Sequence, residues 1–442
     1  RSTLSSSSAA SDVYKRQVDD TYASTPVFVI MKLLIAIALA LQWCIMTCDV
    51  STAFLHADLN ESETIYMWPP KEYYPQGGIL WRLKKAMYGL KGAPRAWQEH
   101  FATTLAPLGF TRFRSDANVY VHYQLMIIIL AYVDDVMLLG KHDDIKNMYE
   151  QLAKQFIMKV TGQLDNDGDE VRFLGRMLCK CTDAVYFTMP DGYFDEAFNM
   201  FKLGKGSTNF AKTPGSKTEK STDNDDLLDQ SNHRLYRRFV GKLQWVCPIR
   251  PDIQFAVKEL ARWLTAPTTR HWNQLKHLMR YLKGTLHYKS FIKPIEKLAN
   301  TAASLDLQVY VDSDWAGCSI TRKSISGVVI TILGTCILAI SRTQSTLALS
   351  SGEAEMYAVG TGSNEALYLR NFILEARLCQ SLNVHIYTDS TAGKAMSSRF
   401  GTSRKTRHVQ LRYLFMQDLV KDGVIQLRKV LGTENPADVC TK

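Results

Sequence analysis

The longest apolar stretch of the chain lies close to its N-terminus and is predicted to form a buried helix. It runs from Val27 to Met46 as "VFVIMKLLIAIALALQWCIM". A transmembrane helix needs about 20 predominantly apolar residues, so a membrane anchor formed by residues 27–46 is the alternative. Lys32 interrupts the stretch, Gln42 lies near its end, and the sequence has no second stretch of this kind. We therefore favour a helix in a protein core, with no membrane as partner.

Shorter apolar runs further along the chain predict β-strands beside this helix. They read "LMIIILAYV", "VMLLG" and "VYFTM", and they follow one another between Leu125 and Met189. Strands interspersed with helices in this way are typical of α+β domains. The segment "TPGSKTEKSTDNDDLLDQSN", from Thr213 to Asn232, is polar and carries five acids, so it is predicted to be a loop or linker.

The last third of the chain predicts one small domain of mixed α/β order. "LQVYVDSDWAG" reads as a strand that ends in acids, and "GVVITILGTCILAISR" reads as a hairpin that turns at Gly334. A long helix, "GEAEMYAVGTGSNEALYLRNFILEARL", and a further strand, "VHIYTDS", come next. The pattern closes with a helix in "HVQLRYLFMQDLV", a strand in "GVIQLRKV" and the start of a helix in "NPADVCTK".

Composition and charge narrow the function classes without selecting one. The 442 residues suffice for two or three domains, and 46% hydrophobic with 22% charged residues is ordinary for a soluble protein. A net charge of +10 favours a polyanionic partner such as nucleic acid. Nine cysteines without a CxxC pair indicate free thiols in a reducing compartment. "CKC" at Cys179 lacks a second Cys/His cluster, which argues against a zinc site.

One segment is far more basic than the rest. Between His233 and Lys283, eleven Lys or Arg residues stand against only Asp252 and Glu259, and seven aromatic residues are interleaved with them. The stripe of apolar residues in "IQFAVKELARWL" predicts a helix. Two interpretations remain open from composition alone. The segment is either a helical subdomain with a solvated basic surface or a clamp that neutralises nucleic-acid phosphates.

Two adjacent acids interrupt an apolar hairpin in "AYVDDVMLLG". If the two apolar runs pair, Asp134 and Asp135 lie at or near the turn, where Asp is common. The alternative is that both face a cation, because an uncompensated buried charge costs several kcal/mol. Asp49 in "TCDVSTAFLHADL" follows the long apolar stretch as if a strand end presents it. Carboxylates that converge from separate strands suit two metal ions in a phosphoryl transfer, so these three acids form a candidate site.

Several long motifs resemble one protein family. "CDVSTAFLHADL", "LKKAMYGLKGAPRAWQEHF" and "AYVDDVMLLG" resemble, in this order, the reverse transcriptase of copia-like retrotransposons. "LYRRFVGKLQWVCPIRPDIQFAVKELARWL" and "HWNQLKHLMRYLKGT" resemble its thumb and connection. "YVDSDWAG", "RKSISG", "ALSSGEAEMYAVG" and "YTDSTAGKA" resemble its RNase H domain. The resemblance covers nearly everything after Gln17.

The resemblance implies an α+β multidomain fold, a fragment of a Pol polyprotein. A right-hand polymerase with palm, partial fingers and thumb would be followed by an RNase H-like mixed α/β domain. The expected divisions are a disordered or artefactual tail (1–17), palm and partial fingers (18–206), thumb and connection with the acidic linker (207–305), and the RNase H-like domain (306–442).

The resemblance also implies the roles of individual residues in the polymerase half. Asp49 and Asp134 would hold two Mg²⁺ ions, with Asp135 assisting and Mn²⁺ as an alternative ion. Val50, Tyr88 and Gly89 would line the dNTP pocket. Phe54 would exclude a ribose 2′-hydroxyl, with an ordinary core Phe as the alternative. The residues expected to contact template or primer are Lys91 and Arg95, although Arg95 and Trp97 could equally be structural.

In the RNase H half, the resemblance implies four metal-binding acids: Asp312, Glu355, Asp389 and Asp438. Two Mg²⁺ ions held there would activate water to cut the RNA strand of an RNA–DNA hybrid. Asp314 and Glu353 are neighbouring alternatives, and Glu353 lies on a different helix face from Glu355. Asp389 and Asp438 also suit helix starts, as an N-cap and a first-turn acid. His408 in "TRHVQLRY" is a candidate substrate contact.

The sequence departs from the family pattern in three places. A Ser-rich tail stands where a basic fingers strand is expected, Gly92 replaces a polar residue, and Gln410 replaces an acid. We therefore expect a complete RNase H half and a polymerase half that lacks cations for the triphosphate. A catalytically inactive nucleic-acid-binding remnant is the alternative. The expected partners are RNA template, DNA primer, RNA–DNA hybrid and dNTPs, in a cytoplasmic virus-like particle with other Gag and Pol products, with the nucleus as an alternative location.

Overall fold

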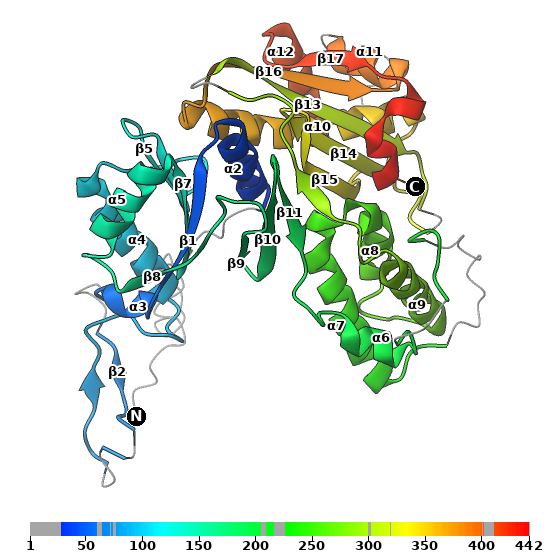
Figure 1. Cartoon of the computed structure of the whole chain (residues 1–442). Coiled ribbons are helices and arrows are strands. Elements are labelled where there is room, and N and C mark those ends of the chain that lie inside the picture. The colour runs from blue at the N-terminus through cyan, green and yellow to red at the C-terminus, as the bar shows by residue number, and fades with distance from the viewer. Residues whose placement is uncertain are drawn as a thin grey trace, which may run out of the picture. The chain divides into compact units, whose positions relative to one another are not determined.

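The structure is a computed structural model that describes residues 28–59, 64–70, 72–73, 77–204, 209–215, 226–298, 302–318, 320–399, 401 and 411–441. The expected tail, residues 1–17, and His408 lie outside the described residues. The chain divides into two compact units (Figure 1). Of the described residues, unit 1 holds 43–163, and unit 2 holds 28–42 and 164–441.

Unit 1 is built on a six-stranded antiparallel sheet in the order β4-β5-β6-β7-β1-β8. β6 (Ile127–Tyr132) and β7 (Asp135–Gly140) form the hairpin that the apolar runs predict, and their side chains are buried except at the turn end. β1 (Cys44–Val50) lies between β7 and β8 (Met158–Gln163). β4 (Thr111–Arg112) and β5 (Val119–His122) complete the sheet.

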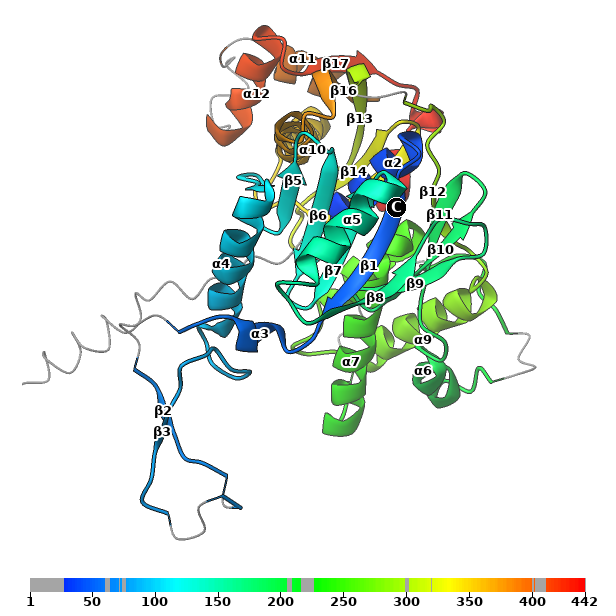
Figure 2. The ribbon, with the colours of Figure 1, turned by 60° about the vertical axis from the view of Figure 1, so that its left-hand side comes forward.

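Two amphipathic helices pack against one side of this sheet. α4 (Ala93–Leu105) buries Trp97, Phe101 and Leu105, which are four residues apart and therefore share one helix face. α5 (His142–Leu152) buries its apolar residues in the same core cluster, which includes Met46 of β1. The short helix α3 (Ala53–His56) follows β1. A two-stranded ribbon of β2 (Tyr66–Met67) and β3 (Trp81–Arg82) then extends from α3 (Figure 2).

Unit 2 begins with α2 (Phe28–Ala40), the predicted buried helix. Its residues from Val29 to Ala38 are all buried, Lys32 included. The Lys32 Nζ donates to the Pro248 carbonyl oxygen at 3.3 Å, and burial lowers the pKa of this amine. The Phe28 ring lies 5.4 Å from the ring of Phe187 in β11. A polar contact at the amine therefore explains how one lysine is accommodated in an apolar helix.

A four-stranded sheet and a set of helices follow in unit 2. The sheet runs in the order β12-β11-β10-β9, with bounds β9 (Glu170–Phe173), β10 (Arg176–Cys181), β11 (Ala184–Thr188) and β12 (Ser290–Ile292). The helices are α6 (Asp195–Met200), α7 (Gln230–Val246), α8 (Gln254–Ala261) and α9 (Thr269–Gly284). β11 matches the strand predicted from "VYFTM".

The basic segment forms α7, α8 and α9, and part of its character is structural. Tyr236 and Phe239 are fully buried, so these aromatic residues belong to a core. The Arg250 guanidinium is buried and bonds to Asp252 and to the Thr285 carbonyl oxygen. Arg262 donates to the thiol of Cys318 in the C-terminal domain. These contacts favour the helical-subdomain interpretation for the residues concerned.

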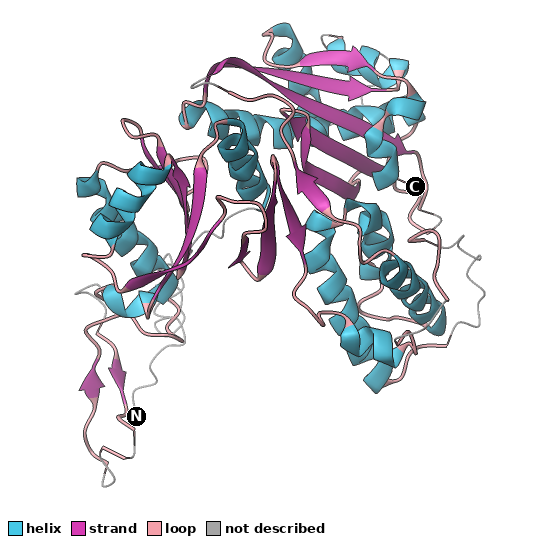
Figure 3. Cartoon of the chain, viewed as in Figure 1, coloured by secondary structure: helices cyan, strands magenta, loops and turns pink. Residues whose placement is uncertain are grey.

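The C-terminal part of unit 2 is a five-stranded sheet in the order β15-β14-β13-β16-β17. β13 (Ala302–Asp314), β14 (Ile325–Ile332) and β15 (Thr335–Thr343) are antiparallel, and the predicted turn at Gly334 joins the last two. β16 (Cys379–Thr388) and β17 (Gln426–Lys429) run parallel to β13. The helices are α10 (Ser351–Glu375), α11 (Thr391–Ser398) and α12 (Leu411–Lys421), as Figure 3 shows by colour.

α10 packs closely on this sheet because it carries glycines on the contact side. A Cβ added at Gly362 would lie 2.7 Å from Val311 of β13, closer than two carbons can approach. At the start of the helix, the Ser350 hydroxyl caps the amide of Glu353, as expected for an N-cap serine. The order of strands and helices matches the mixed α/β order predicted for residues 306–442.

Two local details differ from the sequence-based expectations. The apolar stretch 27–46 is not one helix, because α2 ends at Ala40 and Cys44–Met46 belong to β1. The terminal "NPADVCTK" forms a short 3₁₀ helix, η5 (Pro436–Cys440), whose first turn is capped by Asn435. The two compact units divide after Gln163, and α2 is grouped with unit 2. Among the described residues, none of the helices is long and apolar enough to span a membrane.

Candidate active sites

The three acids expected at the polymerase site lie at one end of the unit 1 sheet. Asp49 of β1 and Asp135 of β7 are directly opposite each other in the antiparallel register. Asp134 lies in the turn between β6 and β7, and its carbonyl oxygen accepts from the Val50 amide at 2.8 Å. All three acids are half-buried. The pair in "YVDD" therefore lies at a turn, and that turn lies beside a third carboxylate.

The turn that carries Asp134 is held from below by a tryptophan. The Trp97 Nε1 donates to the Val133 carbonyl oxygen at 2.7 Å, and the Trp97 side chain is buried in the core. Val133 has a φ of 54°, an unusual value for a β-branched residue, and such strain persists only where the surroundings enforce it. Trp97 therefore has a structural role at the site.

A cation already faces this group of acids. Lys159 of β8 is opposite Asp49 in the sheet register, and its Nζ lies 3.5 Å from the Asp49 Oδ2. Like charges directly opposite each other destabilise a sheet pair, so Lys159 offsets part of the repulsion between Asp49 and Asp135. Oxygen-only carboxylate ligands suit Mg²⁺, and the excess negative charge of the three acids fits such an ion.

The expected nucleotide-pocket residues also come together. The rings of Phe54 and Tyr88 are 4.6 Å apart between centroids, and 52% of the Tyr88 surface is exposed. Gly89 has a φ of 98°, which only glycine adopts without strain. Thr52, between Asp49 and Phe54, has a φ of 52°, which is strained for a β-branched residue. Lys91 is exposed just before α4, and Arg95 is half-buried in its first turn.

The second group of acids is tighter. One ligand atom of each of Asp312, Glu355 and Asp389 lies within 4.8 Å of the others. Asp312 comes from the end of β13, Glu355 from the first turns of α10, and Asp389 directly follows β16. Asp312 and Glu355 are buried, and the Glu355 Oε2 has no hydrogen-bond partner. An orphaned carboxylate oxygen among two other carboxylates is the donor set that a divalent cation needs.

Burial and repulsion change the protonation of this group. They raise the pKa of Glu355 to about 8, with burial as the larger cause and the charges of Asp312 and Asp389 as further causes. The Ser313 amide donates to the Glu355 Oε1 at 3.2 Å, which partly opposes the shift. Three such carboxylates cannot all ionise cheaply without a cation.

The fourth expected acid, Asp438, is not in this group of three. It lies in η5, and it reaches the group indirectly, because the Thr441 hydroxyl bonds to both the Asp438 carbonyl oxygen and the Asp312 carboxylate. Neither of the neighbouring alternatives, Asp314 and Glu353, is in this group. Glu353 instead accepts the Leu349 amide at 3.0 Å and bonds the Tyr357 hydroxyl.

Comparisons with known proteins agree with this geometry. Residues 8–209 match the family described as reverse transcriptase (RNA-dependent DNA polymerase). The chain is 30% identical over 96% of its length to the Pol polyprotein of transposon TNT 1-94 from Nicotiana tabacum, and 29% identical over 93% to that of transposon RE2 from Arabidopsis thaliana. It spans 32% and 27% of those two proteins. The chain belongs to the copia-like retrotransposon Pol polyproteins.

A solved structure has a similar fold over more of this copia-like Pol chain than the family match covers. It is the foamy viral protease-reverse transcriptase in complex with an RNA/DNA hybrid, with a TM-score of 0.51 and 11% sequence identity. The match covers 89% of this chain and 45% of that one. Residues 8–209 are therefore the reverse transcriptase domain of a retrotransposon polyprotein, within a chain of several α/β sheets.

Four residues of this Pol chain support the two acid groups, although no sequence pattern used above predicted that role. Lys159 and Trp97 do so in the reverse transcriptase domain, and Thr441 does so beside Asp312. The fourth is Gln344, which donates to the Ser326 hydroxyl at 3.0 Å and to the Ala354 carbonyl oxygen at 2.8 Å. Each contact joins segments that are distant in sequence, so only the fold reveals it.

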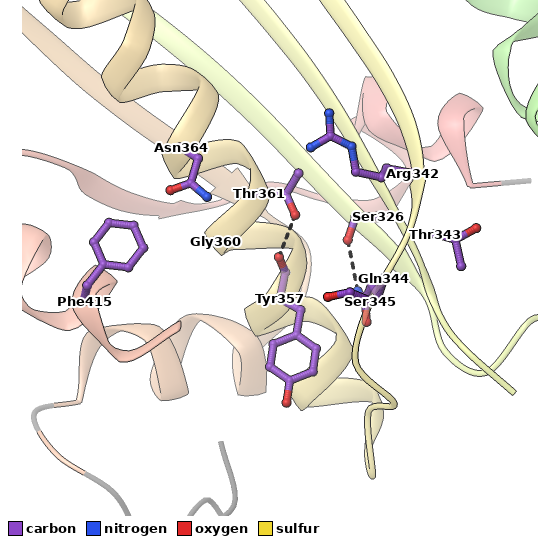
Figure 4. Close-up of a pocket in the computed structure, with 10 residues that line it drawn as sticks. All are labelled: Ser326, Arg342, Thr343, Gln344, Ser345, Tyr357, Gly360, Thr361, Asn364 and Phe415. Carbon is purple, nitrogen blue, oxygen red and sulfur yellow. Dashed lines mark hydrogen bonds between the residues drawn. The ribbon is translucent and has the colours of Figure 1, made fainter. Parts of the chain in front are cut away.

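Gln344 also lines a cavity beside α10. This cavity has a volume of about 380 Å³ and lies between the end of β15, the middle of α10 and Phe415 of α12 (Figure 4). Its lining includes the polar side chains of Arg342, Thr361 and Asn364. It does not include the three acids, but Gln344 connects its wall to the residue preceding Glu355.

Proposed function

We propose that this chain is an RNA-directed DNA polymerase with ribonuclease H activity on RNA–DNA hybrids. Both activities would use two metal ions to transfer a phosphoryl group. The observation that carries the proposal is the convergence of Asp312, Glu355 and Asp389 from three separate elements, with an unpartnered carboxylate oxygen at the centre. The membership of the copia-like family and the register of Asp49 opposite Asp135 support the polymerase half.

In the nuclease half, Asp312, Glu355 and Asp389 would hold Mg²⁺, with Asp438 near by and Mn²⁺ as the alternative ion. When bound, the metal pair supplies an activated water and charge stabilisation for the RNA phosphate. Glu355 must release its proton to ligate, because its pKa is raised to about 8 in the metal-free protein. Thr441 and the Ser313 amide orient the Asp312 and Glu355 carboxylates. Lys429 holds the backbone at Asp389 by donating to its carbonyl oxygen at 2.7 Å.

In the polymerase half, Asp49 and Asp134 would hold the ions, with Asp135 assisting. Trp97 keeps the Val133–Asp134 turn in place, so that the carboxylate is positioned before substrate arrives. Val50, Tyr88 and Gly89 would line the pocket for the incoming dNTP, and Phe54 would block a ribose 2′-hydroxyl from the position beside Tyr88. Lys91 and Arg95 would contact template or primer phosphates.

The proposed substrates are an RNA template, a DNA primer, their hybrid and dNTPs. The chain covers about a third of its plant relatives, so protein partners from the remaining Gag and Pol products are part of the proposal. Location in the cytoplasm within a virus-like particle, or alternatively in the nucleus, is also part of it.

The test uses a labelled RNA–DNA hybrid with Mg²⁺, Mn²⁺ or EDTA, and primer extension on the same substrate. The parent should cleave and extend only with the divalent ion. Asp389→Asn should abolish cleavage and leave extension intact, whereas Asp134→Asn should do the reverse. Asp314→Asn is the matched control for the nuclease, because Asp314 is near Asp312 in sequence but outside the group of three. Asp143→Asn, which changes an exposed side chain in the first turn of α5, is the control for the polymerase.

The alternative function, an inactive nucleic-acid-binding remnant, predicts a different result. It would bind the hybrid in a salt-sensitive way without cleaving or extending it. That outcome in the parent protein would overturn the proposal for both activities.

A further inference from the structure

The β2–β3 ribbon of unit 1 is an ordered extension whose base is tied to the nucleotide pocket. Tyr66 pairs with Arg82, and Met67 pairs with Trp81. The ladder continues towards α3, where the Leu83 amide donates to the Ile65 carbonyl oxygen at 2.9 Å and the Leu59 amide donates to the Lys84 carbonyl oxygen at 3.0 Å. Two residues after this ladder ends at Ala86 comes Tyr88, whose ring lies against Phe54.

One face of this ribbon is much more exposed than the other. Tyr66 is 58% exposed and Trp68 is 66% exposed, while Ile65 and Met67 between them are only partly exposed. On the partner strand, Leu80 is 48% exposed, and Arg82 and Lys84 are exposed as well. Side chains alternate along a strand and directly paired residues share a face. Tyr66, Trp68, Arg82 and Lys84 therefore project from the same side.

Two large aromatic rings on an open face require a physical reason. An isolated two-stranded ribbon is marginally stable, and exposed Trp and Tyr add little to it unless they bind something. Here the rings stand beside cations, and residues 64–91 carry five Lys or Arg residues against the single acid Glu72. Aromatic rings spaced two residues apart, with guanidinium and ammonium groups next to them, suit stacked bases joined by phosphates.

Charge and geometry distinguish between the classes of ligand. The paired bases of a duplex are stacked on one another and offer no free face to a side chain, whereas a single strand does. An apolar protein partner could use the rings and Leu80, which the register places opposite Trp68 on this face, but it gains nothing from Arg82 and Lys84. The combination favours an unpaired nucleic-acid strand.

We propose that this face of the ribbon binds single-stranded nucleic acid, namely the unpaired template approaching the polymerase site. Bases stack on Tyr66 and Trp68, and Arg82 and Lys84 neutralise phosphates. The proposal rests on the proposed function for the identity of the strand, but the binding itself requires no catalysis. The ribbon continues into the loop of Tyr88, so it would deliver the template towards the nucleotide pocket.

The experiment compares ring-removing with ring-conserving variants of the whole chain. The probes are a fluorescein-labelled primer–template with a single-stranded template overhang of about ten nucleotides and a blunt duplex of the same base-paired sequence. Binding is measured by fluorescence anisotropy in EDTA, which prevents cleavage and extension. Tyr66→Leu with Trp68→Leu removes both rings and keeps an apolar strand. Tyr66→Phe with Trp68→Phe keeps both rings.

The double variant with leucine at both positions should bind the overhang substrate about 10-fold more weakly or worse, because stacking of one base on a ring raises the affinity by a factor on the order of ten. The Phe pair should bind like the parent, and blunt-duplex binding should change in neither. Arg82→Gln, which keeps both rings, should weaken overhang binding and lower the slope of log affinity against log salt by somewhat less than one.

Several results would overturn the proposal. They are an unchanged affinity in the Leu pair, an equal loss on the blunt duplex, or equal losses in the Leu and Phe pairs. Failure of the proposed function would give a different result. The parent would not extend the primer in Mg²⁺, regardless of its affinity for the overhang substrate in EDTA. Loss of overhang affinity with an inactive parent would leave the ribbon proposal standing.

Discussion

Asp49 and Asp135 face each other across β1 and β7, one residue from the turn that carries Asp134. Such a like-charged pair costs stability wherever no cation lies between the carboxylates. The Lys159 Nζ lies 3.5 Å from the Asp49 Oδ2. The sheet therefore holds a repulsion that a bound cation would relieve, which gives the site a signature independent of catalysis.

We expect Asp135→Asn to stabilise the metal-free protein and to impair extension. Removing one of two opposed charges should gain about 0.2–1 kcal/mol in EDTA. The denaturation midpoint should rise in EDTA, and the gain should shrink or reverse when Mg²⁺ is added. Asp143→Asn, which removes an exposed acid from α5, should show no such metal dependence. A gain that is the same with and without Mg²⁺ would contradict this view of the site.

Trp97→Phe should damage the polymerase half through the turn at Val133. The substitution keeps an aromatic ring in the core but removes the 2.7 Å hydrogen bond to the Val133 carbonyl oxygen. A carbonyl left without its partner costs about 1–3 kcal/mol where it is buried. We expect primer extension to fall mainly in kcat, while hybrid cleavage in the other unit is unchanged. Asp143→Asn, which changes an exposed side chain of α5, is the control, and it should leave extension intact. Equal extension by both variants would show that the turn does not need Trp97.

The sequence predicted most of the local structure correctly, and the reasons for its failures are specific. The hairpin at Gly334 and the acids at strand ends follow from alternation and turn residues, which are local signals. The end of α2 at Ala40 was not predicted, because a continuous apolar sequence is compatible both with a buried helix and with a central strand. The composition of the basic segment left open a helical subdomain or a clamp on nucleic acid, and the structure shows that its Tyr236 and Phe239 are in a core.

The acid groups themselves illustrate the same limit. The choice of Glu355 over Glu353 rested on family resemblance. In the structure, the Glu353 carboxylate accepts hydrogen bonds from the Leu349 amide and the Tyr357 hydroxyl at the start of α10. Thr441 bonds Asp312 across 129 residues of sequence, and Gln344 bonds Ser326 and Ala354 across 18 and 10 residues. Contacts of that kind depend on how elements pack, and no local pattern encodes them.

The raised pKa of Glu355 predicts a pH-dependent stability without metal. Below the ordinary carboxyl pKa of about 4.5, Glu355 is protonated in both the folded and the unfolded chain, so it costs nothing. Between about 4.5 and about 8, only the unfolded chain ionises it freely, and stability falls as pH rises. Glu355→Gln removes this cost. In EDTA the variant should therefore be more stable than the parent at pH 9, by on the order of a few kcal/mol. At pH 5 the stabilities of the two proteins should be much closer.

Magnesium should reverse that difference, because the parent gains ion binding that the Gln variant lacks. Denaturation midpoints of both proteins, measured from pH 5 to pH 9 in EDTA and in Mg²⁺, test both parts. A stability difference that does not change with pH in EDTA would contradict the raised pKa.

Gln344→Ala should lower cleavage without removing any acid. The Gln344 side chain donates to the Ser326 hydroxyl of β14, as Figure 4 shows. It also donates to the Ala354 carbonyl oxygen, so it fixes the turn of α10 that carries Glu355. A displacement of about 1 Å in a catalytic group can cost about 100-fold in rate. We expect kcat for hybrid cleavage to fall about 10- to 100-fold, with KM and primer extension little changed. Asn364→Ala, in the same cavity wall but exposed, should cleave like the parent.

Gly393→Ala should separate the helix effect of glycine from its role beside Glu355. In an exposed helix interior, replacing Gly by Ala stabilises by about 0.5–1 kcal/mol, and Gly241 of α7, with open space at its Cβ position, should behave in this way. A Cβ at Gly393 of α11 would instead lie 2.6 Å from the Glu355 Cβ, so either α11 or Glu355 must move. Gly393→Ala should therefore lower both the denaturation midpoint and hybrid cleavage, while Gly241→Ala raises the midpoint and cleaves like the parent. Were both variants stabilised and active, the close approach of α11 to Glu355 would not be what positions this acid.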